Sequence, residues 1–333
     1  MIGSTPSFYP NLVKGGSFLK PNTVNISSNS TIKNTRRTLK NLFYSKKIAP
    51  YVFVFPFILI FCGFYLYPVI TTIIMSFYDI LPGQTKFVGL ENYKRLFNPT
   101  FYKALYNTSI YTLWTIVILI PIPLLFAVIL NSKIMKGKTF FRACLFIPAL
   151  TSTIVAGVIF RLLFSESETA FANSFIMFFG LDPITWRQSG PAIMFLMVSL
   201  ATWRWMGVNM IYFLTGLQNI PKEMYEAAEI DGANMINKFW HITIPFLKPV
   251  TVYVLTITLF AGYKMFEEAY VFWEVNSPGN ISLTLVGYLY KEGFQYNQLG
   301  YGSAIGVSLL IIVAILGFIQ LQLTGTFRKK GGN

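Results

Sequence analysis

Apolar residues occur along this chain in six long runs that are separated by shorter polar segments. A bilayer core about 30 Å thick needs roughly 20 helical residues, so each run is long enough to cross a membrane. Six buried helices of a soluble protein would need far more polar residues to cover them. The pattern therefore predicts an all-α integral membrane protein. Its six transmembrane helices are expected at residues 50–77, 107–130, 142–164, 191–217, 249–272 and 301–323.

The composition excludes several other classes of protein. Of the 333 residues, 54% are hydrophobic and only 12% are charged, whereas charged residues make up about 25% of a typical soluble domain. A soluble enzyme and a disordered protein are both excluded. The two cysteines, Cys62 and Cys144, lie in separate apolar runs and offer neither a disulfide framework nor zinc-ligand spacing. We expect no cofactor and no metal.

The net charge of +14 is distributed very unevenly between the polar segments. If the N-terminus is cytoplasmic, 18 of the 27 Lys and Arg residues lie in cytoplasmic segments and 6 lie in outer loops. By the positive-inside rule this ratio predicts that both termini are cytoplasmic. The basic residues are thus signals of topology and contacts to anionic lipid, and we expect no nucleic-acid partner.

These runs and charges divide the chain into five parts. Residues 1–48 contain no acidic residue and are rich in Ser, Asn, Thr and Lys, which is typical of a disordered basic cytoplasmic leader. A first transmembrane helix follows at 49–78 and an outer loop at 79–106. Five further transmembrane helices form a core at 107–323, and a cytoplasmic tail occupies 324–333.

The cytoplasmic loop at 219–248 has a helical pattern of its own. Glu223, Glu226 and several good helix formers follow Pro221, and Gly232 provides a stop. Met224, Ala227, Ala228 and Asp231 are spaced to share one small, flat helix face. Such a helix fits a groove on a partner protein, and the alternative is a helix lying on lipid. The four acidic residues in this stretch argue against an anionic membrane surface.

The sequence EAAEIDGANMINKFWHITIPFLKP at 226–249 resembles the EAA loop of permease subunits in ABC importers. That motif reads EAA, three residues, G, nine residues, I, one residue, LP. Six residues match it in register, and Ile244 replaces the usual Leu. The matching residues are Glu226, Ala227, Ala228, Gly232, Ile242 and Pro245.

Other stretches extend this resemblance over nearly the whole chain from residue 46 to residue 328. FVGLENYKRLF at 87–97 and FRACLFIPALTSTIVAGVIFRLLF at 141–164 are similar to the sugar-importing branch of the family. Within that branch, NSPGNISLTLVGYLY at 276–290 and YNQLGYGSAIG at 296–306 resemble the permeases for arabino-oligosaccharides of Gram-positive bacteria. A permease for another sugar or for glycerol phosphate is the alternative within the family.

The resemblance implies a type I ABC importer permease fold with a cytoplasmic coupling helix that docks on a separate ATPase. The implied partners are a second permease subunit, a dimer of cytoplasmic ATP-binding subunits, an extracellular sugar-binding lipoprotein and the oligosaccharide. The outer loops at 165–190 and 273–300 are the surfaces available to the lipoprotein. The residues expected to couple to the ATPase are Glu226, Ala227, Ala228, Asp231, Gly232 and Pro245.

Charged residues inside the predicted spans are candidates for the substrate path. Arg204 lies near the middle of its span between Trp203 and Trp205, with Asn209 one turn further on. A sugar could stack its C–H faces on such aromatic rings and offer its hydroxyls to the charged group. The alternative is a structural arginine paired with a polar neighbour.

A second charged group lies near the outer end of the fifth predicted span. Lys264 precedes Glu267 and Glu268 by three and four residues, so a same-helix ion pair is expected. Tyr263 lies beside them, which suits either an aromatic belt at the membrane surface or a carbohydrate path. The sequence leaves these two interpretations open.

The chain has no nucleotide-binding motif of the form GxxxxGK[ST], so ATP hydrolysis is assigned to a partner and the chain itself is not an enzyme. A self-contained secondary carrier would be expected to show internal repeats and midplane carboxylates. An intramembrane enzyme would need a cluster of His, Cys or paired acids. The single histidine, His241, has no such neighbours and is interpreted as structural.

Overall fold

The computed structural model describes residues 47–132 and 135–325, which fall into two units, residues 1–67 and 68–333. The described part of the first unit is α2 (Ala49–Phe61), a π-helical turn η1 (Cys62–Leu66) and the first residue of α3 (Tyr67–Met75). With the rest of α3 they form an apolar helical run of 27 residues, Ala49–Met75, long enough to cross a membrane. The expected leader lies outside the described residues except for its last two positions, and the expected tail lies outside them after residue 325.

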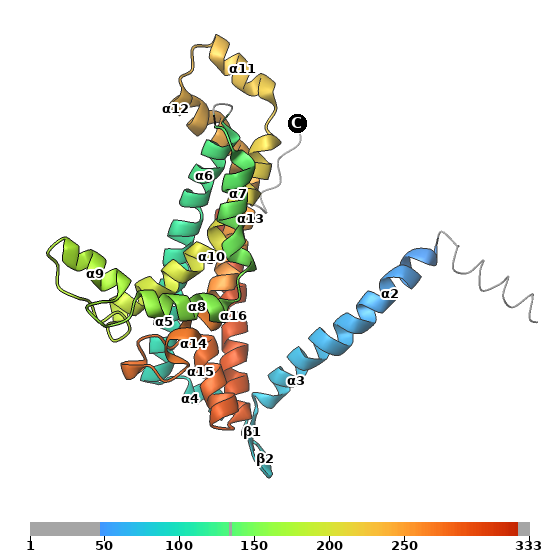
Figure 1. Ribbon diagram of the computed structural model, residues 1–333. Helices are drawn as coiled ribbons and strands as arrows, with labels where there is room; N and C mark the ends of the chain where they lie inside the picture. Colours follow the sequence, from blue (N-terminus) through green and yellow to red (C-terminus); the bar gives the residue numbers. More distant parts are fainter. Residues whose placement is uncertain (1–46, 133–134, 326–333) are drawn as a thin grey trace, which may run out of the picture. The chain divides into compact units, whose positions relative to one another are not determined.

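The second unit is almost entirely helical (Figure 1). Its one sheet among the described residues is a two-stranded antiparallel hairpin, β1 (Tyr78–Leu81) with β2 (Gln84–Phe87). The α-helices that follow are α4 (Glu91–Arg95), α5 (Pro99–Leu119), α6 (Pro121–Asn131), α7 (Lys138–Leu150), α8 (Thr153–Leu163), α9 (Phe171–Phe178), α10 (Gly190–Gln218), α11 (Lys222–Ile230), α12 (Met235–Lys238), α13 (Ile244–Tyr263), α14 (Glu267–Trp273), α15 (Leu285–Tyr290) and α16 (Leu299–Leu323). Short π- or 3₁₀-helical segments are η2 (Phe239–Thr243), η3 (Pro278–Asn280) and η4 (Lys291–Gln295).

Five helical runs in the described residues are long and apolar enough to span a membrane, and a bent pair of helices makes a sixth. The all-α membrane fold expected from the sequence is therefore confirmed. The runs are Ala49–Met75, Pro99–Asn131, Gly190–Gln218, Met235–Trp273 and Leu299–Leu323, and the bent pair is Lys138–Leu150 with Thr153–Leu163.

The third predicted span is not one straight helix. The axes of α7 and α8 differ in direction by 99° across a short break. Thr151 and Ser152 adopt extended backbone conformations at this break, with ψ of 135° and 136°. Pro148, near the end of α7, lacks the N–H that would continue the helical hydrogen-bond ladder. Hydropathy alone does not reveal this bend, because the apolar run continues across the break from α7 into α8.

The expected outer loop at 79–106 is also wrong in part, because it contains the β1–β2 hairpin, α4 and the start of α5. The helix α5 begins at Pro99, eight residues before the predicted start of the second span. Asn98 caps it, since its side-chain oxygen accepts a 2.9 Å hydrogen bond from the N–H of Phe101. Pro99 then occupies the first helical position, where its missing N–H costs nothing.

The long helix α10 forms the centre of the second unit and contacts α5, α6, α7 and α13. It approaches α7 closely at Gly207, where an added Cβ would lie 2.0 Å from the backbone oxygen of Leu145. No side chain fits at this distance, so the glycine lets the two backbones meet. Such small-residue contacts are a common way for helices to pack within membranes.

Gly207→Ala is expected to destabilise the protein strongly, because the new methyl group would have to displace backbone atoms of α7. Overpacking of this kind costs about 1–3 kcal/mol, and more where backbone must move. Thermal unfolding of the detergent-solubilised importer should shift down by several degrees. Gly317→Ala is the matched control, because its Cβ would lie 3.4 Å from the Phe260 ring, at ordinary contact distance. An equal shift for both variants would contradict the proposed close contact.

Candidate functional site

The expected coupling helix is present as α11, at the end of the second unit that also carries α12 (Figure 1). It ends in a Schellman motif, in which Ala233 N–H donates to the Ala228 carbonyl at 2.8 Å and Gly232 N–H donates to the Glu229 carbonyl at 3.1 Å. Gly232 has φ of +75°, a left-handed conformation that favours glycine. The left-handed backbone conformation of Gly232 thus explains why the helix ends here, as the sequence predicts.

Two side-chain contacts hold α11 against the elements that follow it. The Tyr225 hydroxyl is hydrogen-bonded to Thr243 Oγ1 at 2.9 Å, and Lys238 Nζ lies 2.7 Å from Glu229 Oε1. Tyr225 and Ala228 also pack against the apolar cluster around Leu217, Ile242 and Leu247. The helix is therefore presented in a defined position on the end of the bundle.

The expected small face of α11 is divided between two directions. Ala228 is half-buried and packs toward the bundle, whereas Ala227 is exposed. The two are neighbours in sequence, 100° apart around the helix, so only one of them lies on the outer side. Glu226 is exposed beside Ala227. This corrects the prediction that the two alanines form one flat face.

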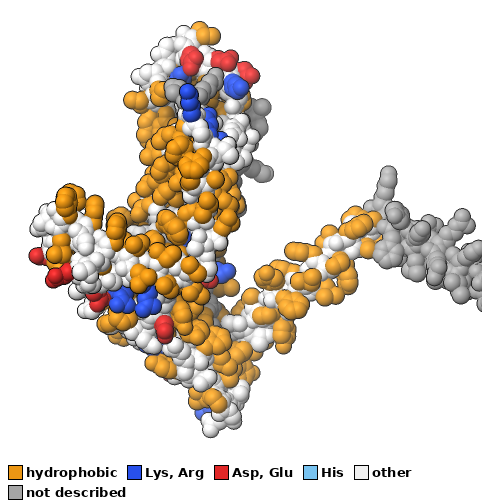
Figure 2. Space-filling view, in the orientation of Figure 1, with side chains coloured by type: hydrophobic (Ala, Val, Ile, Leu, Met, Phe, Trp, Pro, Cys, Tyr) orange, Lys and Arg blue, Asp and Glu red, His pale blue; other side chains and the backbone are white. Residues whose placement is uncertain are grey.

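The outward surface of α11 and α12 combines charge with large apolar side chains. Ile230 is 87% exposed, Met235 82% and Ile236 68%. Asp231 is exposed at the C-terminal cap of α11, and Pro245 is exposed in the first turn of α13. Figure 2 shows charged side chains gathered at this end, next to a long stretch of hydrophobic surface. We name Glu226, Ala227, Ile230 and Asp231 the α11 surface.

The two charged groups of the membrane region meet in one ion pair. Arg204 on α10 and Glu268 on α14 lie 3.5 Å apart between Nη1 and Oε1, with side chains only 12% and 11% exposed. The Nε of Arg204 is buried and, among the described residues, has no hydrogen-bond partner. The Arg204 guanidinium also lies 5.5 Å from the centre of the Trp205 ring.

The expected same-helix pairing of Lys264 with Glu267 and Glu268 is wrong. The helix α13 ends at Tyr263 and α14 begins at Glu267, so Lys264 is not on the helix that carries the two acids. Lys264 and Glu267 are both exposed, whereas Glu268 is buried. The break turns Glu268 toward α10 and makes the Arg204 pair possible.

A cavity of about 320 Å³ lies beside this ion pair, between α5, α10 and α13. It contains Trp205, Asn209 and Glu268 from the predicted set, together with the aromatic residues Tyr212 and Tyr253, whose rings are 5.2 Å apart. Tyr111 on α5 also lines it and was not identified from the sequence, because it lies in an unremarkable apolar run.

Asn209 has a structural partner at the wall of this cavity. Its amide donates a 3.0 Å hydrogen bond to the carbonyl of Leu119, the last residue of α5. In a continuous helix that carbonyl would accept from residue 123, but Pro123 has no N–H. Asn209 therefore satisfies a carbonyl that the proline leaves free.

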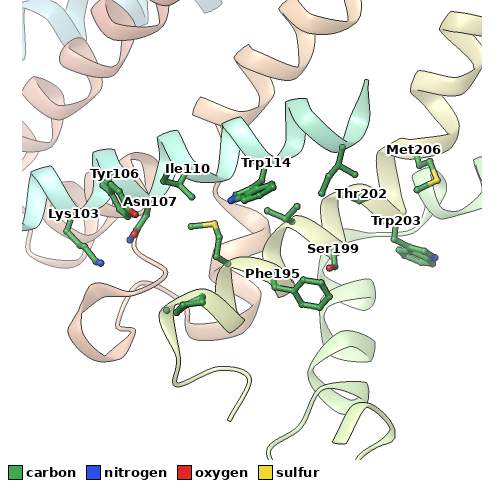
Figure 3. Close-up of a pocket in the computed structure, with 15 residues that line it drawn as sticks. Lys103, Tyr106, Asn107, Ile110, Trp114, Phe195, Ser199, Thr202, Trp203 and Met206 are labelled. Carbon is green, nitrogen blue, oxygen red and sulfur yellow. The ribbon is translucent and has the colours of Figure 1, made fainter. Parts of the chain in front are cut away.

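The remaining predicted path residues lie elsewhere. Trp203 lines a different cavity of about 850 Å³ between α5 and the first half of α10, whose walls carry Trp114 and Phe195 (Figure 3). Tyr263 is buried and hydrogen-bonded to Ser109 at 2.9 Å. Only Trp205, Asn209 and Glu268 share one cavity, with Arg204 beside it.

A comparison with known protein families places residues 95–329 in the family of binding-protein-dependent transport system inner membrane components. The chain belongs to this family. It is a transmembrane permease of an ABC importer and a component of the cell membrane. Members of the family work with a second permease, and ATP is hydrolysed on a separate ATPase subunit, so this chain is not itself an enzyme.

Two relatives match most of the chain. The arabinooligosaccharides transport system permease protein AraP of Bacillus subtilis is 61% identical over 292 residues, covering 88% of this chain and 93% of the relative. The protein of the same name from Halalkalibacterium halodurans is 56% identical over 299 residues, covering 90% and 94%.

Solved structures show the same fold. A chain from a bacterial alginate ABC transporter, in complex with a periplasmic protein bound to an alginate pentasaccharide, superposes with a TM-score of 0.75 at 21% identity. The match covers 88% of this chain and 100% of the other. This confirms the type I importer permease fold expected from the EAA motif.

Proposed function

We propose that this chain is one of two permeases of an ATP-driven importer that carries arabino-oligosaccharides into the cell. The observation that carries this proposal is the high identity, over nearly the full length of both chains, to two permeases named for that substrate. The aromatic and charged cavity beside Arg204 is chemically suited to an oligosaccharide, because sugars offer both apolar faces and many hydroxyls.

Both termini face the cytoplasm in this proposal, as the excess of Lys and Arg in the alternating segments indicates. The end of the second unit that carries α11 is then cytoplasmic. The opposite end, with α4 and α15, is extracellular and faces the sugar-binding lipoprotein.

The α11 surface docks in a cleft of the ATPase. Glu226 faces a basic residue there, Ala227 permits close approach, and Ile230 supplies apolar contact area. Closure of the ATPase dimer on ATP moves the attached permeases between inward-open and outward-open arrangements as nearly rigid bodies. The Tyr225–Thr243 and Glu229–Lys238 contacts transmit this motion from α11 to η2 and α12, the elements that lead into α13.

The oligosaccharide passes the cavity that holds Trp205, Asn209 and Glu268. One sugar face stacks on Trp205, and hydroxyls bond to Glu268, whose carboxylate is held by Arg204 beside the cavity.

Uptake in a strain that lacks this chain tests the substrate. Labelled arabinotriose, maltotriose and glycerol 3-phosphate are supplied in turn, with and without a plasmid that restores the chain. We expect only arabinotriose uptake to be lost without the chain and regained with it. Unchanged uptake of arabinotriose in the deletion strain, or loss of maltotriose or glycerol 3-phosphate uptake alone, would overturn the assignment.

Trp205→Ala tests the position of the path. Loss of one stacking surface should raise the half-saturating sugar concentration roughly tenfold, the equivalent of about 1.4 kcal/mol. Trp203→Ala is the matched control, because Trp203 has nearly the same exposure, 40% against 41%, but lines the other cavity. Sugar-stimulated ATPase activity in proteoliposomes measures both. A larger effect at Trp203 would place the path in the α5–α10 cavity instead.

A further inference from the structure

The loop between α8 and α10 contains a short helix with a strongly apolar outer side. Three phenylalanines on α9 and a fourth at its C-terminal cap follow helical spacing and are 59–83% exposed: Phe171, Phe175, Phe178 and Phe179. The Phe179 ring lies 5.3 Å from the Phe175 ring and 5.4 Å from the Phe178 ring. Phe171 lies one helical turn before Phe175, so the four residues share one face of the helix, which we call the phenylalanine patch.

The protein holds this patch in a fixed position. Asn173, on the opposite side of α9, is fully buried, and its side-chain oxygen accepts hydrogen bonds from the Trp186 ring N–H at 2.8 Å and the Ile184 N–H at 3.1 Å. Its amide donates to the Ser167 carbonyl at 3.1 Å. Ala172 and Ile176 pack into the apolar core with Trp186. The loop is thus folded around Asn173. Because the phenylalanines lie on the other side of α9, this arrangement directs them outward.

The two sides of this loop differ in polarity. Figure 2 shows hydrophobic side chains along the upper edge of the lobe that contains α9 and acidic side chains along its lower edge. The acids of the loop are Glu166, Glu168 and Asp182. The upper edge lies toward the end of the unit that carries α11, and the lower edge lies toward the end that carries α4 (Figures 1 and 2).

An exposed apolar surface also precedes the patch. On α8, which leads into the loop, Ile154 is 65% exposed, Val155 55% and Leu162 70%. In a membrane protein such residues contact acyl chains. A rigid patch of four phenylalanines standing in water would be unusual, since exposed apolar patches mark interaction sites.

We propose that α9 lies in the outer surface of the membrane, with the phenylalanine patch inserted among the lipid chains and the acidic edge in water. This is the arrangement of an interfacial amphipathic helix. The loop carries three acids and one basic residue, Arg187, so apolar burial rather than attraction to anionic headgroups holds it there. The role is additional to transport and does not depend on which sugar is carried.

A fluorescence experiment on the complete importer tests this placement. Cys62 and Cys144, which are both free, are first replaced by serine. Single cysteines are then introduced as Phe175→Cys and, independently, Phe178→Cys, with Glu168→Cys as the matched control on the acidic side of the same loop. Each is labelled with the polarity-sensitive dye NBD, and the importer is reconstituted in phosphatidylcholine vesicles with or without doxyl-labelled phosphatidylcholine.

We expect NBD at 175 and 178 to emit at shorter wavelength and to be quenched at least threefold more by doxyl lipid than NBD at 168. Aqueous iodide should show the reverse order, and the lipid quenching should be the same in low and high salt. Quenching by iodide at 175 and 178 equal to that at 168 would overturn the proposal. Resistance of 175 and 178 to both quenchers would also overturn it, because a protein partner would then cover the patch.

Discussion

Glu226→Lys is expected to reduce sugar uptake by about 100-fold or more while leaving the protein inserted in the membrane. Glu226 is exposed on α11, so the change costs little folding stability. In the proposed complex it replaces an attractive contact with a basic residue by a like-charge contact, which costs several kcal/mol at an interface. A loss of 2.7 kcal/mol or so already corresponds to about 100-fold.

Glu91→Lys is the control for this variant. Glu91 is an exposed glutamate at the opposite end of the second unit, and its partner Lys94 is also exposed, so the same charge reversal there should leave the ATPase bound to the permease. Copurification of the ATPase with the permease distinguishes the cause, because only Glu226→Lys should lose the ATPase. Full uptake by Glu226→Lys would contradict the docking role of the α11 surface.

The second large effect is expected at the Arg204–Glu268 pair. Removing one member leaves an uncompensated charge in a site that is only about one-tenth exposed, which costs roughly 3–5 kcal/mol. Arg204→Met and Glu268→Leu should each lower the thermal unfolding temperature strongly. The double variant should be more stable than either single variant, because apolar residues of similar size often replace a buried ion pair without loss.

Glu267→Leu provides the matched control, since Glu267 adjoins Glu268 on α14 but is exposed. It should change the unfolding temperature little. Sugar-stimulated ATPase activity then distinguishes a structural role of Arg204 and Glu268 from a role in substrate binding. We expect the double variant to regain stability but to remain unresponsive to sugar. A double variant less stable than both single variants would contradict the pairing, and one with a full sugar response would remove both residues from the path.

The sequence predicted best those features that depend on local chemistry. The membrane requires long apolar runs, so the spans were found from hydropathy alone. The coupling helix was found because Pro221 and Gly232 mark its ends and the EAA motif is specific. Its stop at Gly232 depends only on the backbone conformation of that residue.

The features that the sequence did not predict depend on distant contacts. The break after Tyr263 is stabilised by Thr284, whose hydroxyl donates a 3.1 Å hydrogen bond to the Met265 carbonyl from nineteen residues away. This break, and not helix spacing, decides that Glu268 meets Arg204. In the same way, the inward direction of Ala228 follows from the apolar cluster behind α11, which periodicity alone does not locate.

The hydrogen bond from Asn209 to the Leu119 carbonyl has a mechanical consequence. The chain breaks between α5 and α6, and the Asn209 side chain of α10 is hydrogen-bonded to the last carbonyl before this break. A change in the angle between α5 and α6 would leave the Leu119 carbonyl without its hydrogen-bond partner inside the membrane, at a cost of several kcal/mol. We therefore expect α5, α6 and α10 to keep their mutual arrangement during transport.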